Sequence, residues 1–164
     1  MLKTEITYYK TPIGIAKIMG DTNGIQSVSV LNDDEISLEI LQQKTPKCLQ
    51  KCVLQLEEYF NGKRASFNLT VNPRGTNFQK KVWKSLLDIP YGKTRTYLQQ
   101  SKFLGDVKAI RAVAAANGKN PLWIVIPCHR VIGSDGSLTG YAGGIWRKKW
   151  LLAHENPVKQ QSLF

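Results

Sequence analysis

Histidine, cysteine and, in the second half of the chain, acidic side chains are scarce in this 164-residue sequence. Two histidines and three cysteines are too few for a disulfide framework or a histidine-rich metal centre. Structural zinc takes four ligands, and Cys48 and Cys52 have no histidine before His129 to complete a set. We therefore predict no bound metal. The odd cysteine count suits a reducing compartment in which one thiol is left to react.

A long apolar run is also lacking. The longest, Leu122–Pro127, is far shorter than the roughly 20 residues that a membrane helix needs. The opening residues Met1–Glu5 have no apolar segment after their lysine, so no secretory signal is predicted. From these absences we expect a cytoplasmic protein with no membrane partner.

The net charge of +11 is unevenly distributed. Residues 1–71 hold eight basic and eight acidic side chains, whereas residues 72–164 hold fifteen basic and four acidic ones. A basic half joined to a neutral half is typical of a polyanion-binding module with a neutral companion. The alternative is a charge excess that serves only solubility.

The first part of the chain predicts strands and tight turns, followed by helix. A helical spacing covers 33–43, and a longer helix is expected from about Pro46 to Phe60. The boundary falls at Asn72–Gly75, which gives domains at 1–75 and 76–164. The expected strands are Thr7–Lys10, Ile13–Met19, Ile25–Leu31 (after the Asn23-Gly24 turn) and Phe67–Val71.

The second part changes to helical patterns. Thr76 and Gln79 form a capping box, and a last helix is expected at Ile145–Glu155. Tyr97–Phe103, a short glycine turn and Val107–Asn117 make a helix-turn-helix pattern. An ordinary helical hairpin gives the same pattern, so the basic charge is needed to favour DNA binding.

A reactive cysteine is indicated by the run Ile-Pro-Cys-His-Arg-Val-Ile at 126–132. A thiol attacks as thiolate, and an imidazole or cationic neighbours lower its pKa. Cys128 has His129 and Arg130 beside it and follows a strand-like segment, Leu122–Ile126. The alternative is a buried structural cysteine, the commoner fate of a free thiol.

This heptad and several spaced partners resemble the O6-alkylguanine-DNA alkyltransferases, also called methylated-DNA–protein-cysteine methyltransferases. The similarity covers about 76–157, and its further matching residues are Tyr97, Arg111, Asn120-Pro121, Tyr141–Gly144 and Trp150–Glu155. The resemblance implies an N-terminal ribonuclease-H-like α/β domain with a small antiparallel sheet and a mostly helical, winged-helix-like C-terminal domain.

The resemblance also implies DNA repair by direct reversal. An alkyl group passes irreversibly from O6-alkylguanine, and by expectation O4-alkylthymine, to Cys128 after base flipping. Each protein molecule accepts one group, because a thioether is not readily hydrolysed. The implied partner is double-stranded DNA containing alkylated guanine, met at the minor groove by a monomer without a cofactor.

The family assigns catalytic roles to five positions. Cys128 is the nucleophile, while His129 and Glu155 activate it through a water between imidazole and thiol. Tyr97 would donate a proton or hydrogen bond to the guanine ring nitrogen, and Asn120 would bond to the backbone of the active-site turn. A helix-end salt bridge for Glu155 and a core tyrosine at Tyr97 are the alternatives.

DNA contacts are expected from Arg111, Ala112, Ala115, Arg130 and Tyr97. Small alanines let a helix approach the minor groove closely, and the family uses an arginine at the position of Arg111 to fill the stack after base flipping. A plain phosphate contact by Arg111 is the milder alternative.

The substrate pocket is expected to include Trp123, Val131, Tyr141, Ala142 and Gly143. Glycine permits close approach of backbone to a flat base. Relatives often have serine at the Ala142 position and a smaller residue at the Trp123 position, so the accepted alkyl size stays open.

Two other functions fit parts of the sequence. A cysteine hydrolase or amidase would use Cys128, His129 and Glu155 as a triad with repeated turnover. It would leave the basic second half unexplained. A lesion-binding protein without repair activity resembles the alkyltransferase-like proteins, but these lack the cysteine.

Overall fold

The computed structural model describes residues 2–157, which form two compact units. The first runs up to Arg74 and also includes Pro121–Val125. The second comprises Gly75–Asn120 and the described residues from Ile126 onward. The sequence prediction placed 121–125 in the second domain. The residues around this segment do not show that it pairs with a strand of the first unit.

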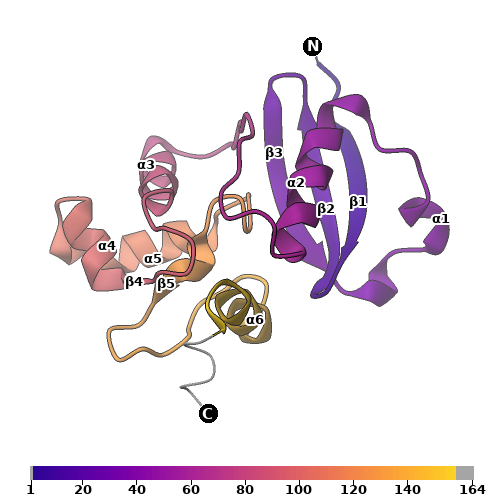
Figure 1. Cartoon of the computed structure of the whole chain (residues 1–164). Helices are drawn as coiled ribbons and strands as arrows, with labels where there is room; N and C mark the ends of the chain where they lie inside the picture. The colour runs from indigo at the N-terminus through magenta and orange to yellow at the C-terminus, as the bar shows by residue number, and fades with distance from the viewer. Residues whose placement is uncertain (1, 158–164) are drawn as a thin grey trace. The chain divides into compact units, whose positions relative to one another are not determined.

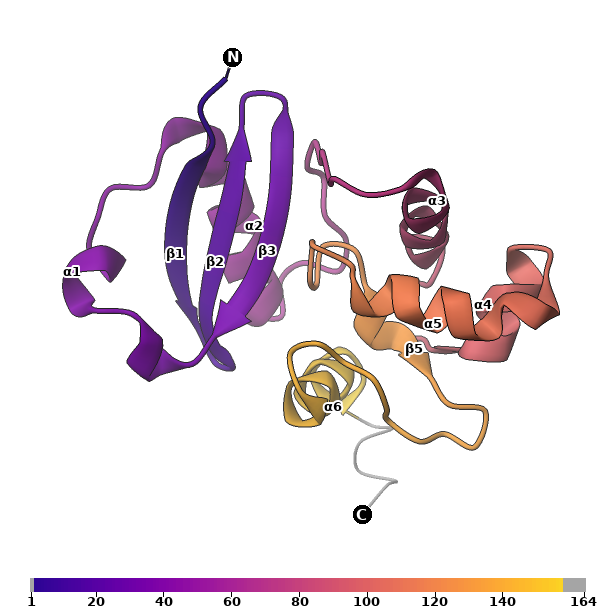
Figure 2. The same cartoon turned by 180° about the vertical axis from the view of Figure 1, so that it is seen from behind.

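An antiparallel sheet with the order β1-β2-β3 forms the first unit. Its strands are β1 (Glu5–Thr11), β2 (Gly14–Asp21) and β3 (Gly24–Leu31), and helix α2 (Gln50–Phe60) covers one face of the sheet (Figures 1 and 2). Gly24 begins β3 at a φ of 140°, and an added Cβ would lie 2.9 Å from the Thr70 carbonyl oxygen. The predicted Asn23-Gly24 turn therefore requires glycine.

The outer edge of β3 is covered by irregular chain. Val28 donates to the Pro121 carbonyl at 2.8 Å and accepts from the Trp123 amide at 2.9 Å. The predicted strand Phe67–Val71 is wrong, since only Val71 makes an isolated bridge, to Ile25. The segment Leu122–Ile126 is likewise not a strand: it makes one bridge, to Val28, and turns at Ile124, whose φ is 74°.

Two predicted helices of this unit are shorter than expected. Residues 33–43 form a 3₁₀ turn (Asp33–Glu35) and the four-residue helix α1 (Leu38–Leu41). The Ser37 side chain accepts from the Ile40 amide, so it caps a new helix instead of continuing the first one. Before α2, Lys47–Leu49 is a 3₁₀ turn.

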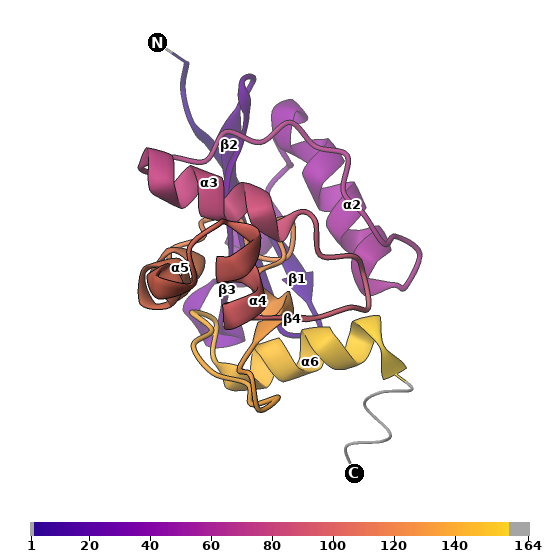
Figure 3. The same ribbon diagram turned by 90° about the vertical axis from the view of Figure 1, so that its left-hand side faces the viewer.

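The second unit is mainly helical (Figure 3). Its helices are α3 (Asn77–Leu86), α4 (Tyr97–Phe103), α5 (Ile110–Gly118) and α6 (Ile145–Glu155). The bounds predicted for α4 and α6 are confirmed, and the Thr76 and Gln79 capping box is formed. The helix predicted at Val107–Asn117 begins instead with a 3₁₀ turn, Val107–Ala109.

Helices α3 and α5 pack through a small core. Val82, Val113 and Ala116 are buried together, and the Trp83 indole donates to the Ala116 carbonyl at 2.8 Å. Among the described residues, no helix is long and apolar enough to cross a membrane.

A two-stranded parallel sheet connects the start of α4 to the cysteine turn. Strand β4 (Arg95–Thr96) pairs with β5 (Val131–Ile132), with Arg95 opposite Val131. Tyr97 directly follows β4, and the 3₁₀ turn Cys128–Arg130 directly precedes β5. This pairing brings two distant predicted site segments together.

Candidate active site

Cys128 lies on a tightly bonded turn. The Cys128 amide and the Asn120 side-chain amide both donate to the Ile126 carbonyl, each at 2.8 Å. Asn120 also hydrogen-bonds the thiol. The residue is only 8% exposed, so a reacting group must be brought to the sulfur.

Burial raises the pKa of the Cys128 thiol. The Asn120 hydrogen bond and the positive charge of Lys148 act in the opposite direction but do not outweigh burial. The thiol is therefore protonated at rest. The cationic neighbours in the sequence therefore do not leave a thiolate at rest, and the reaction needs a base.

His129 and Glu155 form a fully buried pair. The His129 Nε2 atom lies 2.7 Å from Glu155 Oε2, with side-chain exposures of 0% and 1%. Burial lowers the pKa of His129, although Glu155 opposes this, so the ring is neutral. Its Nε2–H then donates to the carboxylate. Nδ1 is left as the basic atom, and it is buried without a hydrogen-bond partner among the described residues.

Arg130 supports Glu155 from the other side. Its Nε and Nη2 donate to Oε1 and Oε2 at 2.8 and 3.1 Å, and Nη1 donates to the Ile89 carbonyl at 2.8 Å. Burial alone would raise the pKa of Glu155, but His129 and Arg130 outweigh it and hold that pKa well below its usual range. Arg130 is 6% exposed and donates to Glu155 and Ile89, so little of it is accessible for the DNA contact expected from the sequence.

Tyr97 and Lys148 converge on one backbone oxygen. The Tyr97 hydroxyl donates to the Thr139 carbonyl at 3.1 Å, and Lys148 Nζ donates to the same oxygen at 2.8 Å. Lys148 is 1% exposed, and its burial lowers its pKa to about 8 against the opposing effect of Cys128. Burial also raises the pKa of Tyr97.

Lys148 is the site residue that sequence reasoning missed. It lies in the run Arg147–Lys149, which looks like a solvated basic cluster. Its spacing on α6 is the signal that could have found it. Lys148, Leu151 and Glu155 are three and then four residues apart, and all three are buried on one helix face.

Helix α5 presents the residues expected to meet DNA. Arg111, Ala112 and Ala115 are exposed, while Val113 and Ala116 are buried on the opposite side. The helix therefore has a narrow, small-residue face with one long cation on it.

The residues expected in the pocket have different surroundings. Tyr141 interacts electrostatically with Cys128, and burial raises its pKa well above the usual value. The Gly143 carbonyl accepts from Arg147 at 3.1 Å, and Ala142 is exposed. Val131 is fully buried in β5, and Trp123 belongs to the first unit.

No three histidine, cysteine, aspartate or glutamate side chains gather as a metal site within residues 2–157. A buried thiol next in sequence to a neutral histidine that a paired carboxylate orients is the arrangement of an enzyme with a cysteine nucleophile. The same unit also has the exposed α5 face and the basic charge, which are features of a DNA-binding surface.

Comparisons with known proteins identify the family. The model described as "6-O-methylguanine DNA methyltransferase, DNA binding domain" matches residues 77–157, and its "ribonuclease-like domain" matches residues 6–73. A methylated-DNA–protein-cysteine methyltransferase of Methanosarcina barkeri is 46% identical over 149 residues, which cover 89% of this chain and 93% of the relative.

Comparison with solved structures indicates the same family. The O6-methylguanine methyltransferase of Mycobacterium tuberculosis is 37% identical, with a TM-score of 0.79 over 94% of each chain. The same organism's OGT in complex with DNA is 41% identical, with a TM-score of 0.81 over 92% of each chain. The chain therefore belongs to the 6-O-methylguanine DNA methyltransferase family. The predicted fold class and the enzyme class, methylated-DNA–protein-cysteine methyltransferase, are confirmed.

Proposed function

We propose that the protein repairs O6-alkylguanine, and also O4-alkylthymine, in duplex DNA by moving the alkyl group to Cys128. The observation that carries this proposal is the buried Cys128 thiol with a neutral His129 whose Nδ1 has no protein partner. In the transfer, a carbon–sulfur bond forms and the carbon–oxygen bond to the base breaks. The product is a thioether, so each molecule acts once.

His129 acts as the base. Because the thiol pKa is raised, its proton must leave as sulfur attacks, and Nδ1 accepts it through an intervening water. Glu155 stabilises the imidazolium that forms, and Arg130 keeps Glu155 ionised in its buried position. In this order of steps His129 removes the thiol proton, so the thiol can react although burial raises its pKa.

Tyr97 and Lys148 assist the other side of the reaction. Tyr97 gives its proton or a hydrogen bond to the guanine ring nitrogen as the base leaves, which is general-acid assistance. Lys148 is the cation that lowers the thiol pKa, and it stabilises the developing thiolate. Asn120 bonds both the turn and the thiol and so positions the sulfur.

The buried position of Cys128 requires the base to leave the duplex. A target atom inside the stack is reached by base flipping, which costs about a few kcal/mol. Helix α5 approaches the minor groove with Ala112 and Ala115, and Arg111 enters the stack. A DNA complex of the Mycobacterium tuberculosis relative supports DNA as the partner, and we infer that the protein binds it as a monomer.

Mass spectrometry tests the proposal directly. Incubation with a duplex containing O6-methylguanine should add one methylene mass per protein molecule, on the peptide that contains Cys128. Cys128→Ser should bind the lesion without accepting the group, because an unactivated hydroxyl is a far poorer nucleophile. Turnover beyond one equivalent would refute the single-use mechanism and favour the cysteine hydrolase.

A further inference from the structure

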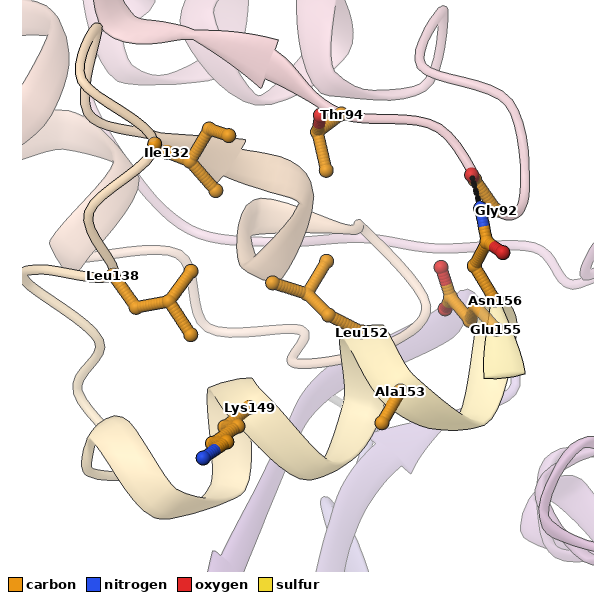
Figure 4. A pocket seen from close by; sticks show the side chains of 10 residues that line it. Gly92, Thr94, Ile132, Leu138, Lys149, Leu152, Ala153, Glu155 and Asn156 are labelled. Atoms are coloured by element: carbon orange, nitrogen blue, oxygen red, sulfur yellow. Dashed lines mark hydrogen bonds between the residues drawn. The ribbon is translucent and has the colours of Figure 1, made fainter. Parts of the chain in front are cut away.

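The second unit contains a cavity of about 190 Å³ beside α6. In Figure 4 the side chains of Ile132, Leu138 and Leu152 point toward a common space. Its lining includes neither Cys128 nor Tyr97, although it does include Glu155 of the relay. The lining also includes Thr94, Lys149, Ala153, Glu155 and Asn156.

The lining selects an uncharged, mainly apolar ligand. The Glu155 side chain is 1% exposed and already pairs with His129 and Arg130, so it offers no site for a cation. Lys149, the other charged residue of the lining, is exposed to solvent, where an ion pair contributes little. Thr94 and the Asn156 amide supply the polar groups, and the amide donates to the Gly92 carbonyl at 3.1 Å (Figure 4).

The volume is sufficient for a small aromatic ring. A dry cavity of about 150 Å³ lined by aliphatic side chains holds benzene in another protein. A cavity of about 190 Å³ therefore has space for a somewhat larger molecule, such as the bicyclic indole.

Leu138 and Thr139 connect the cavity to the residues of the reaction site. Leu138 lines the cavity, and the carbonyl of the next residue, Thr139, accepts from both Tyr97 and Lys148. The Tyr97 hydroxyl has one proton, so it cannot donate to Thr139 and to a guanine nitrogen together. Alkyl transfer with Tyr97 as donor therefore requires this bond to break.

We propose that the cavity is a regulatory site for a small uncharged aromatic molecule. A ring packed against Leu138 stabilises the position in which Thr139 holds the Tyr97 hydroxyl, and so slows alkyl transfer. The effect on rate rests on the function proposed above for Tyr97, whereas the binding itself does not.

Indole is the molecule to test first. In protein with ¹³C-labelled methyl groups, indole should shift the signals of Ile132, Leu138 and Leu152 with one common dissociation constant. Ala153→Phe fills the cavity and should abolish these shifts, and the milder Ala153→Leu should weaken them. Ala65→Phe, the same change at an exposed position of the first unit, should leave them unchanged.

The rate is measured in a single turnover on methylated duplex DNA. A ligand that binds only the resting state slows transfer by the factor 1 + [L]/Kd, so indole at about nine times Kd gives an about tenfold slower reaction. The Ala153→Phe rate should not respond to indole. This control removes any effect of indole on the DNA itself.

The methyl shifts test the binding site, and the single-turnover rate tests the regulation. Absence of methyl shifts in the three cavity residues overturns the binding site. Saturating shifts with an unchanged wild-type rate overturn the regulation. If wild-type protein transfers no alkyl group without indole, the proposed function and the rate effect fail together, and the methyl shifts still decide the site.

Discussion

Arg130 and Glu155 form a two-pronged buried ion pair, with nitrogen–oxygen distances of 2.8 and 3.1 Å. The same carboxylate holds His129 at 2.7 Å. Glu155 therefore serves both the reaction and the folded state, and a substitution there changes both. Experiments on the relay must separate these two effects.

Glu155→Gln should lower the alkyl-transfer rate and the stability together. Breaking a buried pair leaves Arg130 uncompensated, at a cost of about 3–5 kcal/mol. The double variant Arg130→Met/Glu155→Gln should recover part of that stability but not the rate, because the amide cannot stabilise an imidazolium. Urea unfolding and single-turnover rates give the two quantities. A double variant as fast as wild type would show that Glu155 is only a structural partner.

Lys148→Met should lower the reactivity of Cys128 below about pH 8, where Lys148 carries its charge. Removing the cation removes an effect that lowers the thiol pKa, so less thiolate forms at a given pH. The pH dependence of Cys128 alkylation by iodoacetamide, followed on its own peptide, measures this. Lys149→Met, the adjacent exposed lysine, is the matched control and should keep the wild-type profile. Identical profiles for the two variants would remove Lys148 from thiol activation.

Acid should destabilise the protein through His129. The pKa of a free histidine is about 6.5, and burial makes the folded value lower. Between these two values the unfolded chain binds a proton that the folded protein does not. The stability is therefore fully present above about pH 6.5 and falls below it, by at most about 1.4 kcal/mol per pH unit.

Urea unfolding between about pH 7 and pH 5 tests this window. His129→Gln should show a shallower loss of stability there. Glu155 contributes little to the change in this range. Its pKa is lowered in the folded protein, so the stability it provides is lost only as the pH falls below the unfolded value of about 4.3. Equal slopes for the variant and wild type would assign the acid sensitivity to other groups.

Arg111→Ala should separate base flipping from chemistry. The side chain is exposed on α5, so its removal should not disturb the fold. Repair of duplex substrate should slow strongly, whereas reaction with free O6-benzylguanine, which needs no flipping, should stay near wild type. Lys63→Ala, exposed in the first unit, controls for loss of one positive charge. Equal losses on both substrates would place Arg111 in the pocket or the fold.

DNA affinity should fall linearly with salt on a log–log plot. Each neutralised phosphate contributes a slope of about −0.9 for duplex DNA, and the basic residues of 72–164 supply the contacts. Titration at several ionic strengths measures it. An affinity that does not change with salt would mean that the +11 charge serves solubility.

Local signals predicted much of the second unit. The bounds of α4 and α6 follow from local signals, such as the Thr96 cap before α4 and the Asn156-Pro157 stop after α6, which lie within a few residues of the helix ends. Cys128, His129 and Glu155 came from the resemblance. The strand predicted at Phe67–Val71 failed because strand formation depends on a distant partner, and only Val71 has one.

The partners of buried charges could not be predicted from the sequence. Arg130 and Glu155 are 25 residues apart, and nothing near either one shows that they meet. Lys148 looks exposed within its basic run, and only the packing of α6 buries it. The raised thiol pKa could not be predicted either, because burial depends on the whole surrounding fold.

The backbone bonds from Val28 to Pro121 and Trp123 also bear on synthesis at the ribosome. Strand β3 is translated early, but the chain that covers its edge at Val28 emerges more than ninety residues later. Until then the nascent sheet presents an unpaired edge, a feature that favours pairing with other chains. The first unit therefore completes its fold only after most of the second has been translated.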